Sequence, residues 1–266
     1  EGCELLVMIP AAAEADPRAD DGVAAETTLA RLSQGRPATC ATVECSPDDT
    51  AVILYTSGTT GTPKGAELSH SNLMMNAMVS VGLCKLDAND VSLLALPLFH
   101  SFGQSVQMNA SVACGGAMVL LPRFDPEAAM QAMATHGVSV FCGVPTMYIA
   151  LLNHDWQGPD IAATLRVGVS GGAAMPVAVL RGFEQRFGVV ILEGYGLSET
   201  SPVATFSHFD MQRVSGSIGV PVAGVELYQR VGFGTRGERS ADARSPRERE
   251  CKQRRRRRGR IERDAG

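Results

Sequence analysis

The sequence predicts an α/β fold in which mostly parallel sheets are flanked by helices. Short apolar segments that suit buried strands alternate with segments of about 8 to 15 residues that suit helices, as in such folds. A loop rich in glycine, serine and threonine directly follows the first of these strands. The 266 residues are 45% hydrophobic, which is sufficient for a sizeable core. In folds of this class, ligands bind in loops at the carboxyl ends of the strands.

The expected strands are short, apolar and rich in β-branched residues, and turn-forming residues bound them. They are residues 51–55, 91–96, 117–121, 138–142, 165–169 and 189–192. The segment 11–49 before them is rich in Ala, Asp, Glu and Pro, so we expect a surface connection that ends in the turn at 46–49.

The expected helices are residues 69–83, 126–136, 146–153 and 176–187. Ser71 or Asn72 is expected to cap the first helix, because either side chain can accept a hydrogen bond from an unpaired N–H. Asp125 is expected to cap the second helix. Its first position suits Pro126, because proline lacks only an N–H that the first turn cannot use. Gly137 is expected to end this helix, because glycine readily adopts φ > 0.

Composition argues against several classes of protein. The seven cysteines form no C-x-x-C pair and suggest neither a disulfide framework nor a zinc site, so a cytoplasmic location is expected. The longest apolar runs fall short of the roughly 18 residues that a membrane span requires, so no span is expected. Residues 1–10 lack the basic and long apolar regions of a signal peptide and do not begin with Met, so we expect a chain that is entered partway.

Residues 55–65, with the sequence YTSGTTGTPKG, have the composition of a phosphate-binding loop. Glycines let a phosphate approach the backbone N–H groups, hydroxyls can donate hydrogen bonds, and a lysine supplies positive charge. These residues are Thr56, Ser57, Gly58, Thr59, Thr60, Gly61, Lys64 and Gly65. A Walker A loop is excluded, because it requires Ser or Thr after the lysine and Gly65 follows Lys64 here. A flexible surface turn is the alternative interpretation.

This loop resembles the phosphate loop of the adenylate-forming superfamily, which includes acyl-CoA synthetases, aryl-CoA ligases, luciferases and peptide-synthetase adenylation domains. Three later segments are similar to further motifs of that family, in the family's order. They are 97–104 (PLFHSFGQ), 169–176 (VSGGAAMP) and 193–202 (EGYGLSETSP). The resemblance implies that the chain is the central part of the large N-terminal domain of such an enzyme, most like a bacterial medium- or long-chain fatty-acid–CoA ligase.

The resemblance also implies roles for individual residues. The loop would hold the β and γ phosphates of ATP and the departing pyrophosphate. His100 would lie beside the substrate carboxylate, although a histidine packed beside Phe99 and Phe102 is the alternative. Ser198 would donate to the α-phosphate, and Glu199 would hold Mg²⁺, which prefers a few carboxylate and phosphate oxygens together with water. The implied catalytic residues are His100, Lys64, Ser198 and Glu199.

The resemblance of the motifs at 169–176 and 193–202 implies an adenine-binding slot. Tyr195 offers a flat apolar face for stacking, and small residues leave room for the purine edge. The implied nucleotide-binding residues are Gly171, Gly172, Ala173, Ala174, Glu193, Gly194, Tyr195, Gly196 and Ser198. An ordinary tight turn is the alternative for residues 171–176. The family often has Gln or Asn at the position of Glu193, which leaves the contact of this carboxyl group open.

The implied reaction joins a carboxylic acid to ATP, releases pyrophosphate, and passes the acyl group from acyl-AMP to the thiol of coenzyme A. ATP, Mg²⁺ and coenzyme A are the implied cofactors and co-substrates, and a fatty acid is the expected substrate. The apolar residues Phe102, Val106 and Met108 suit an acyl chain, or are simply core. An aryl-CoA ligase and an adenylation domain that loads a carrier protein are the alternative enzymes.

Three segments are expected along the chain: a partial N-terminal segment and connection at 1–47, an AMP-binding core at 48–227, and a basic tail at 228–266. Residues 227–266 hold 14 of the 24 basic side chains and 6 of the 28 acidic ones. The tail has few apolar residues and is expected to be disordered. It is either an out-of-frame or appended terminus or an electrostatic tail that attracts nucleic acid or lipid.

The family's later Gly-Asp motif and lysine-bearing C-terminal domain are not visible in the sequence, so a weak or inactive synthetase is expected. A nucleotide-binding remnant, or a nucleic-acid binder that uses the Arg-rich tail, is the non-enzymatic alternative. No specific nucleic-acid partner is expected, and the oligomeric state stays open.

Overall fold

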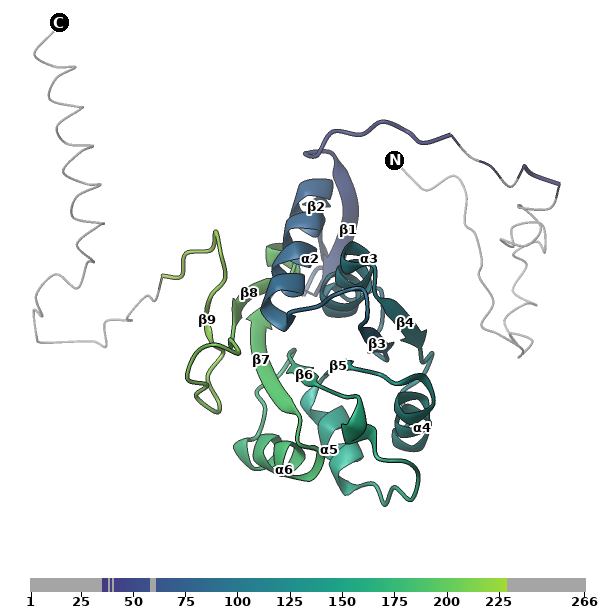
Figure 1. Cartoon of the computed structure of the whole chain (residues 1–266). Helices are drawn as coiled ribbons and strands as arrows, with labels where there is room; N and C mark the ends of the chain where they lie inside the picture. Colours follow the sequence, from purple (N-terminus) through teal and green to yellow (C-terminus); the bar gives the residue numbers. More distant parts are fainter. Residues whose placement is uncertain (1–34, 38, 40, 58–60, 229–266) are drawn as a thin grey trace, which may run out of the picture. The chain divides into compact units, whose positions relative to one another are not determined.

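The computed structural model describes residues 35–37, 39, 41–57 and 61–228 (Figure 1). The chain divides into two compact units, Glu1–Ala223 and Gly224–Gly266. Every described helix and strand belongs to the first unit. Most of the expected connection at 1–47, and all of the basic tail at 228–266 except Tyr228, lie outside the described residues.

A seven-stranded mixed sheet organises the described part of the first unit, in the order β4-β3-β5-β6-β7-β8-β9. The strands are β3 (Val91–Leu94), β4 (Ala117–Leu120), β5 (Val140–Gly143), β6 (Val167–Ser170), β7 (Val190–Gly196), β8 (Val203–Phe206) and β9 (Val220–Pro221). β4, β3, β5, β6 and β7 run parallel, whereas β8 and β9 pair antiparallel. The predicted α/β fold with mostly parallel strands is confirmed.

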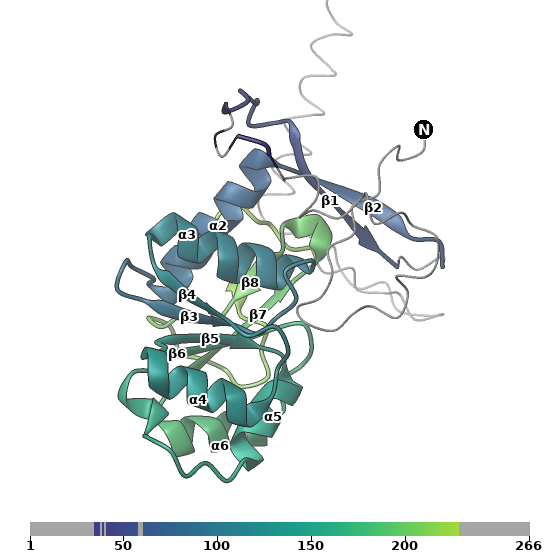
Figure 2. The same ribbon diagram turned by 90° about the vertical axis from the view of Figure 1, so that its right-hand side faces the viewer.

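Helices cover both faces of this sheet, as parallel crossovers require (Figure 2). One layer consists of α2 (His70–Cys84), the π-helix η2 (Phe102–Asn109) and α3 (Ala110–Cys114). The other contains α4 (Pro126–His136), α5 (Pro145–Asn153) and α6 (Val177–Phe187), with the 3₁₀ turn η3 (Ile161–Ala163) in a connection. No described helix has both the length and the apolar character that a membrane crossing would need.

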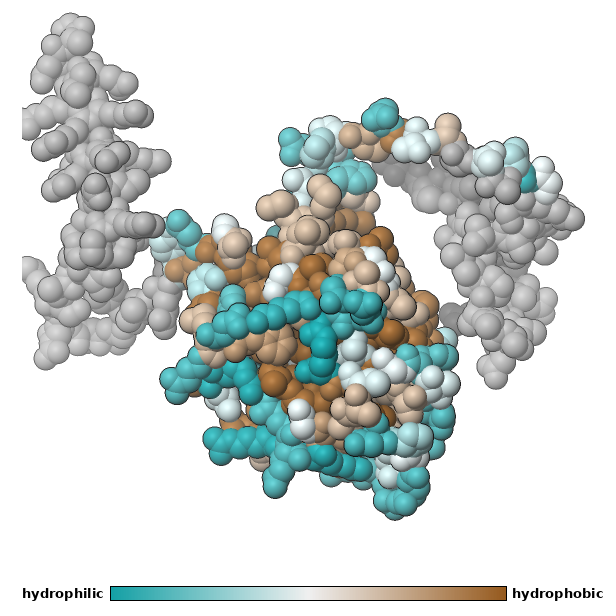
Figure 3. Space-filling model, viewed as in Figure 1, coloured by the Kyte–Doolittle hydropathy of each residue, from teal (hydrophilic) through white to brown (hydrophobic). Residues whose placement is uncertain are grey.

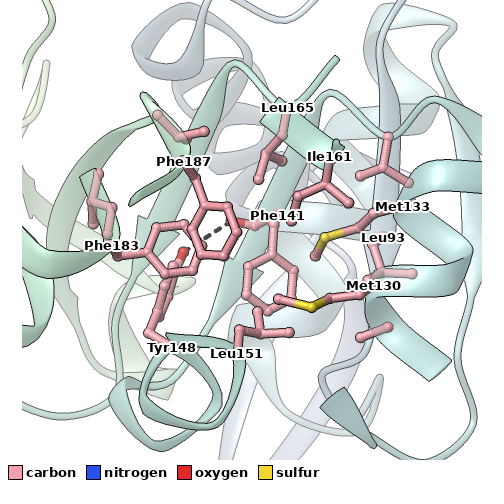
Figure 4. Close-up of a cluster of buried hydrophobic side chains, with 14 of the residues drawn as sticks. Leu93, Met130, Met133, Phe141, Tyr148, Leu151, Ile161, Leu165, Phe183 and Phe187 are labelled. Atoms are coloured by element: carbon pink, nitrogen blue, oxygen red, sulfur yellow. Dashed lines mark hydrogen bonds between the residues drawn. The ribbon is translucent and has the colours of Figure 1, made fainter. Parts of the chain in front are cut away.

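The main core lies between the sheet and the layer of α4, α5 and α6 (Figure 4). Tyr148 of α5 is fully buried there, and its ring meets those of Phe141 and Phe183 edge-on. Its hydroxyl lies 3.1 Å from the carbonyl oxygen of Phe141 and 3.0 Å from that of Val169. Burial raises the pKa of this hydroxyl, so it stays protonated as a donor. The contacts fix α5 to β5 and β6.

A second, two-stranded sheet pairs β1 (Thr50–Thr56) antiparallel with β2 (Lys64–Ser69). The first strand is predicted by the sequence, but β2 is not, because KGAELS has no apolar run. The pairing places Thr56 opposite Lys64 and Tyr55 opposite Gly65. A Cβ at Gly65 would lie 2.7 Å from the Ile53 side chain, so Ile53 would have to shift to admit any other residue there. The ribbon therefore holds the two ends of the phosphate loop side by side.

Helix α2 begins at His70, and the expectation that Ser71 or Asn72 caps it is wrong. Ser69 is the N-cap: its Oγ accepts a hydrogen bond of 3.2 Å from the Asn72 N–H, and Asn72 Oδ1 accepts one of 3.1 Å from the Ser69 N–H. This reciprocal pair satisfies two backbone donors at once, which no cap at Ser71 would do. The predicted cap of α4 is confirmed, because Asp125 accepts from the Ala128 N–H at 3.0 Å.

The side chains of α2 depart from the usual pattern of a helix, in which apolar residues are buried and polar residues are exposed. Met74, Met75 and Met78 are more than half exposed, and Figure 3 shows further apolar residues, in brown, on the face of the molecule in view. The buried side of α2 instead contains Asn76 and Ser80. Buried polar groups need hydrogen-bond partners, so these two residues must find theirs within the fold.

A partly buried ion pair, of a buried Asp90 and a more exposed Arg166, joins the amino ends of the strands, at the edge opposite to the loops expected to bind ligands. Arg166 donates to Asp90 from Nε at 2.8 Å and from a terminal nitrogen at 2.5 Å, and Ser139 Oγ donates to the same carboxylate at 2.6 Å. Arg166 also donates to the carbonyl oxygens of Cys84 and Lys85 at 3.0 and 2.9 Å. The end of α2 is thereby tied to the sheet.

Candidate functional site

A cavity of about 390 Å³ lies at the carboxyl ends of β1, β6 and β7. Its lining comes from the end of β1, the start of η2, the turn after β6, the turn after β7, and β8. The lining residues are Thr56, Ser57, His100, Ser101, Phe102, Val106, Val169, Ser170, Gly171, Gly172, Gly194, Tyr195, Gly196, Leu197, Ser198, Glu199, Pro202, Val203 and Phe206. The four motifs found in the sequence therefore converge on one space, at the edge where α/β sheets bind ligands.

The phosphate loop is described at both ends, whereas the predicted Gly58, Thr59 and Thr60 lie outside the described residues. Thr56 and Ser57 line the cavity. Gly61 has a φ of +78°, a backbone conformation that favours glycine. Lys64 is exposed at the start of β2, opposite Thr56, and is not among the described residues that line the cavity.

His100 lines the cavity from a tight turn between β3 and η2. Its Nδ1 lies 3.1 Å from the backbone nitrogen of Phe102, whose N–H donates to it. A neutral imidazole with an accepting Nδ1 carries its proton on Nε2, so His100 offers an N–H donor. Gly103 permits this turn, because a Cβ there would lie 2.6 Å from the carbonyl oxygen of Pro97.

The residues after β6 divide into two groups. Gly171 and Gly172 line the cavity, whereas the exposed Ala173 and Ala174 are absent from the lining that the described residues form. A Cβ on Gly171 would lie 3.2 Å from the Phe102 ring, and Gly172 has a φ of +79°. Side chains at either position would therefore narrow or strain the slot. Tyr195 lines the cavity with 44% of its surface exposed, which leaves its ring available for stacking.

Ser198 and Glu199 line the cavity from the turn that follows β7. This turn contains the 3₁₀ segment η4 (Ser198–Thr200), and the Leu197 N–H closes it by donating to the carbonyl oxygen of Pro202 at 3.2 Å. A Cβ on Gly196 would lie 2.0 Å from that same oxygen, so the turn can close only over glycine.

Glu199 faces the phosphate loop. The Thr56 hydroxyl donates to its Oε1 at 3.3 Å. The described residues contain no group of three or more His, Cys, Asp and Glu side chains that could hold a metal by themselves. One carboxylate beside a hydroxyl nevertheless fits Mg²⁺, because this ion takes most of its ligands from phosphate and water.

Glu193 has a different environment from the other motif residues. Its carboxylate accepts a hydrogen bond of 3.1 Å from the Gly216 N–H, and the described lining of the cavity does not include it. Burial raises the pKa of Glu193, and the bond from Gly216 opposes that shift. Glu193 thus contacts the segment before β9, and the structure shows no approach of its carboxyl group to the cavity within the described residues.

Part of the apolar lining is not predicted by the sequence. Phe102 and Val106 are expected from the sequence and line the cavity, whereas Met108 is absent from its described lining. Val203 and Phe206 also line it, but they belong to β8, which the sequence analysis did not predict. The short run VATF, with β-branched and aromatic residues, was the available signal for this strand.

Several known proteins are similar to this chain in sequence. The family of AMP-binding enzymes matches residues 4–230. A long-chain-fatty-acid–CoA ligase of Bacillus subtilis (strain 168) is 40% identical over 176 residues, which are 65% of this chain and 31% of the relative. A feruloyl-CoA synthase of an Amycolatopsis species is 35% identical over 65% of this chain and 35% of its own length. The chain thus spans about a third of the length of these curated relatives.

Solved structures indicate the same family as the sequence relatives. ATP-bound MatB from Rhodopseudomonas palustris superposes with a TM-score of 0.71 and 33% identity, over 82% of this chain and 45% of that one. The predicted resemblance to adenylate-forming acyl-CoA synthetases is confirmed, and this chain belongs to the family of AMP-binding enzymes.

Proposed function

We propose that this chain forms the ATP- and acid-binding core of a ligase that converts a carboxylic acid to acyl-AMP and then to its coenzyme A thioester. The observation that carries the proposal is the convergence of Thr56, His100, Ser198 and Glu199 on one cavity. These residues come from three motifs that are far apart in the sequence, and each supplies a group that the chemistry needs.

The first step brings two anions together, because the substrate carboxylate attacks the α-phosphorus of ATP and displaces pyrophosphate. Catalysis therefore depends on neutralising charge and aligning the attack. In this proposal Ser198 donates to an α-phosphate oxygen, and the loop from Thr56 to Lys64 holds the leaving pyrophosphate. Mg²⁺, held by Glu199, would supply positive charge to the phosphates.

His100 is the proposed donor to the substrate carboxylate. The Phe102 N–H occupies its Nδ1, which leaves the Nε2–H for the acid. A neutral donor can orient a carboxylate oxygen without transferring its own proton to it. His100 in this proposal aligns the attacking oxygen, and no proton transfer is required in the step.

The adenine would stack on Tyr195 and place its edge against Gly171 and Gly172, where a side chain would narrow or strain the slot.

The acid would occupy the apolar part of the cavity. Phe102, Val106 and Phe206 line this part, which suits an alkyl or aryl group. We propose a fatty acid, in keeping with the resemblance to long-chain ligases. An aryl acid is the alternative, because a feruloyl-CoA synthase is similar over the same share of the chain.

We place the reaction in the cytoplasm, because the described Cys45, Cys84, Cys114 and Cys142 are free thiols.

Pyrophosphate release with a panel of acids tests this function. The panel consists of octanoate, laurate, palmitate, ferulate and malonate, each with Mg²⁺ and ATP. Release that requires a fatty acid and falls in Glu199→Gln supports the proposal, while the exposed Glu44→Gln serves as the matched control. Release that depends on ferulate alone would replace the fatty acid by an aryl acid. Thermal stabilisation by ATP without release for any acid would instead indicate a nucleotide-binding remnant.

A further inference from the structure

Asn76 connects α2 to the turn that carries Ser198 and Glu199. It lies on the buried side of α2 with 8% of its surface exposed, outside the described lining of the cavity. Its Oδ1 accepts from the Val203 N–H at 3.3 Å, and its Nδ2 donates to the carbonyl oxygens of Val203 at 3.2 Å and Thr200 at 3.4 Å. The amide thus pairs with both backbone groups of Val203 and with the last residue of η4.

These bonds link two parts of the site that are distant in sequence. Asn76 is separated from Thr200 by 124 positions and from Val203 by 127. Helix α2 directly follows β2, which leaves the phosphate loop at Lys64. Residues Thr200 and Val203 lie just after Glu199. A continuous connection therefore runs from the phosphate loop through β2, α2 and the Asn76 hydrogen bonds to the turn that bears the candidate metal ligand.

The chemistry of the amide explains why asparagine suits this position. The backbone of residues 200–203 presents one N–H and two carbonyl oxygens to α2, and a single amide side chain can satisfy a donor and acceptors together. An aliphatic residue would leave these buried backbone groups without partners, which is unfavourable. A carboxylate could accept from the Val203 N–H but could not donate to either carbonyl oxygen.

We propose that Asn76 is a positioning residue, which holds the Ser198–Glu199 turn at the distance from the phosphate loop that the Mg²⁺ complex of ATP requires. This inference rests on the proposed function. The hydrogen bond between Thr56 and Glu199 shows how the turn and the phosphate loop are aligned. Asn76 maintains this alignment from α2. Without the amide, the turn would still be closed by Leu197 and Pro202 but would be free to shift away from the loop.

Hydrogen exchange of the full chain, measured by mass spectrometry or NMR, tests the structural half of the proposal. In Asn76→Ala and in Asn76→Asp, which has the same size but no donor, amide exchange at 199–203 is expected to accelerate about tenfold or more. Ser80→Ala is the matched control. Ser80 is equally buried one turn further along α2, and its hydroxyl donates to Asn76 O inside the helix at 2.9 Å. In Ser80→Ala, amide exchange at 199–203 is expected to stay within about twofold of the wild type. Unchanged exchange in the Asn76 variants would overturn the proposal.

The Mg²⁺ dependence of ATP binding tests the functional half. The Mg²⁺ concentration that gives half of the ATP-dependent thermal stabilisation is expected to rise about tenfold in Asn76→Asp and to stay unchanged in Ser80→Ala. Faster exchange at 199–203 with an unchanged Mg²⁺ requirement would reduce Asn76 to a purely structural residue and contradict the proposal. Asn76→Ser keeps a smaller polar group and gives the same comparison if Asn76→Ala does not fold.

A failure of the proposed function has a different signature. In that case the wild-type chain itself shows neither stabilisation by Mg²⁺ and ATP nor pyrophosphate release. The exchange measurement alone then decides whether Asn76 holds the turn: acceleration confined to the Asn76 variants supports it, and its absence overturns it.

Discussion

The hydroxyl of Thr56 donates a hydrogen bond of 3.3 Å to Oε1 of Glu199, between residues that lie 143 positions apart in the chain. Thr56 ends β1 at the phosphate loop, and Glu199 lies in the turn after β7. The contact brings the hydroxyl-rich loop and a carboxylate to the same edge of one cavity. A phosphate group held by the loop would therefore lie near the carboxylate that can share its metal ion.

Replacing Glu199 by Gln removes the negative charge while keeping the size of the side chain. We expect pyrophosphate release to fall roughly 100-fold, because the charge that holds Mg²⁺ beside the phosphates is lost. Titration of Mg²⁺ at fixed ATP checks this. The exposed Glu44→Gln should behave as the wild type, and an equal loss in both variants would count against a specific role for Glu199.

His100→Ala is expected to lower the rate of pyrophosphate release roughly tenfold to a hundredfold at saturating ATP, because the acid loses its aligning donor. His100→Gln should recover part of the rate, since its amide also donates. The ¹⁵N shifts of the imidazole in the neutral ring give an independent check. They should show the proton on Nε2, and a proton on Nδ1 would contradict the hydrogen bond from Phe102.

Gly196→Ala is expected to destabilise the chain by about 2 kcal/mol and to abolish the Mg²⁺ dependence of ATP binding. The added Cβ would lie 2.0 Å from the carbonyl oxygen of Pro202, so the turn that holds Ser198 and Glu199 could not close. Gly82→Ala in α2 is the control. Outside the backbone of its own helix and its chain neighbours, no described atom lies within 4 Å of a Cβ there, and the change should stabilise the helix by up to about 1 kcal/mol. Urea denaturation compares the two variants.

The ion pair between Asp90 and Arg166 is expected to matter for stability and not for ligand binding. Arg166→Met leaves the Asp90 carboxylate buried without its main partner, and should lower the free energy of unfolding by about 2 kcal/mol at pH 7. Arg181→Met, at an exposed position of α6, should change it by less than about 0.5 kcal/mol. A similar effect of both variants would show that the pair contributes nothing specific.

The same pair predicts how stability depends on pH. Burial alone would raise the pKa of Asp90, but the hydrogen bonds from Arg166 and Ser139 outweigh it and lower the pKa below the ordinary value of 3.8. A lowered folded pKa stabilises the fold above the unfolded value, and this stabilisation is lost as the pH falls below 3.8 toward the folded value. Acid denaturation should therefore show a smaller change over this range in Asp90→Asn than in the wild type.

Much of the candidate site was predictable because its signals are local. The segments around Thr56, His100 and Glu199 combine glycines with polar side chains in short runs, and the structure brings all three to one cavity. The strands β3 to β7 and the helices α4, α5 and α6 follow from apolar runs and caps for the same reason, whereas η2 and α3 are not predicted.

Other features depend on contacts that the local sequence does not encode. The run from Ser69 to Asn72 offers several possible caps, and only the reciprocal bond between these two residues selects Ser69. The sequences of β2 and of the π-helix η2 show no clear hydrophobic periodicity. Strand pairing therefore determines β2, and packing against neighbouring elements determines η2. Asn76 has no local signature, because its partners lie more than a hundred residues away.

Formation of acyl-AMP is the most direct test of the central claim, that this cavity binds ATP and an acid together. The full chain is incubated with ATP labelled at the α-phosphate, Mg²⁺ and palmitate, and the products are separated after acid quenching. We predict labelled acyl-AMP in the wild type at the low yield expected of a weak synthetase, with its amount strongly reduced in Glu199→Gln and His100→Ala and unchanged in Glu44→Gln. A folded chain that binds ATP yet yields no acyl-AMP with any acid of the panel would contradict the account.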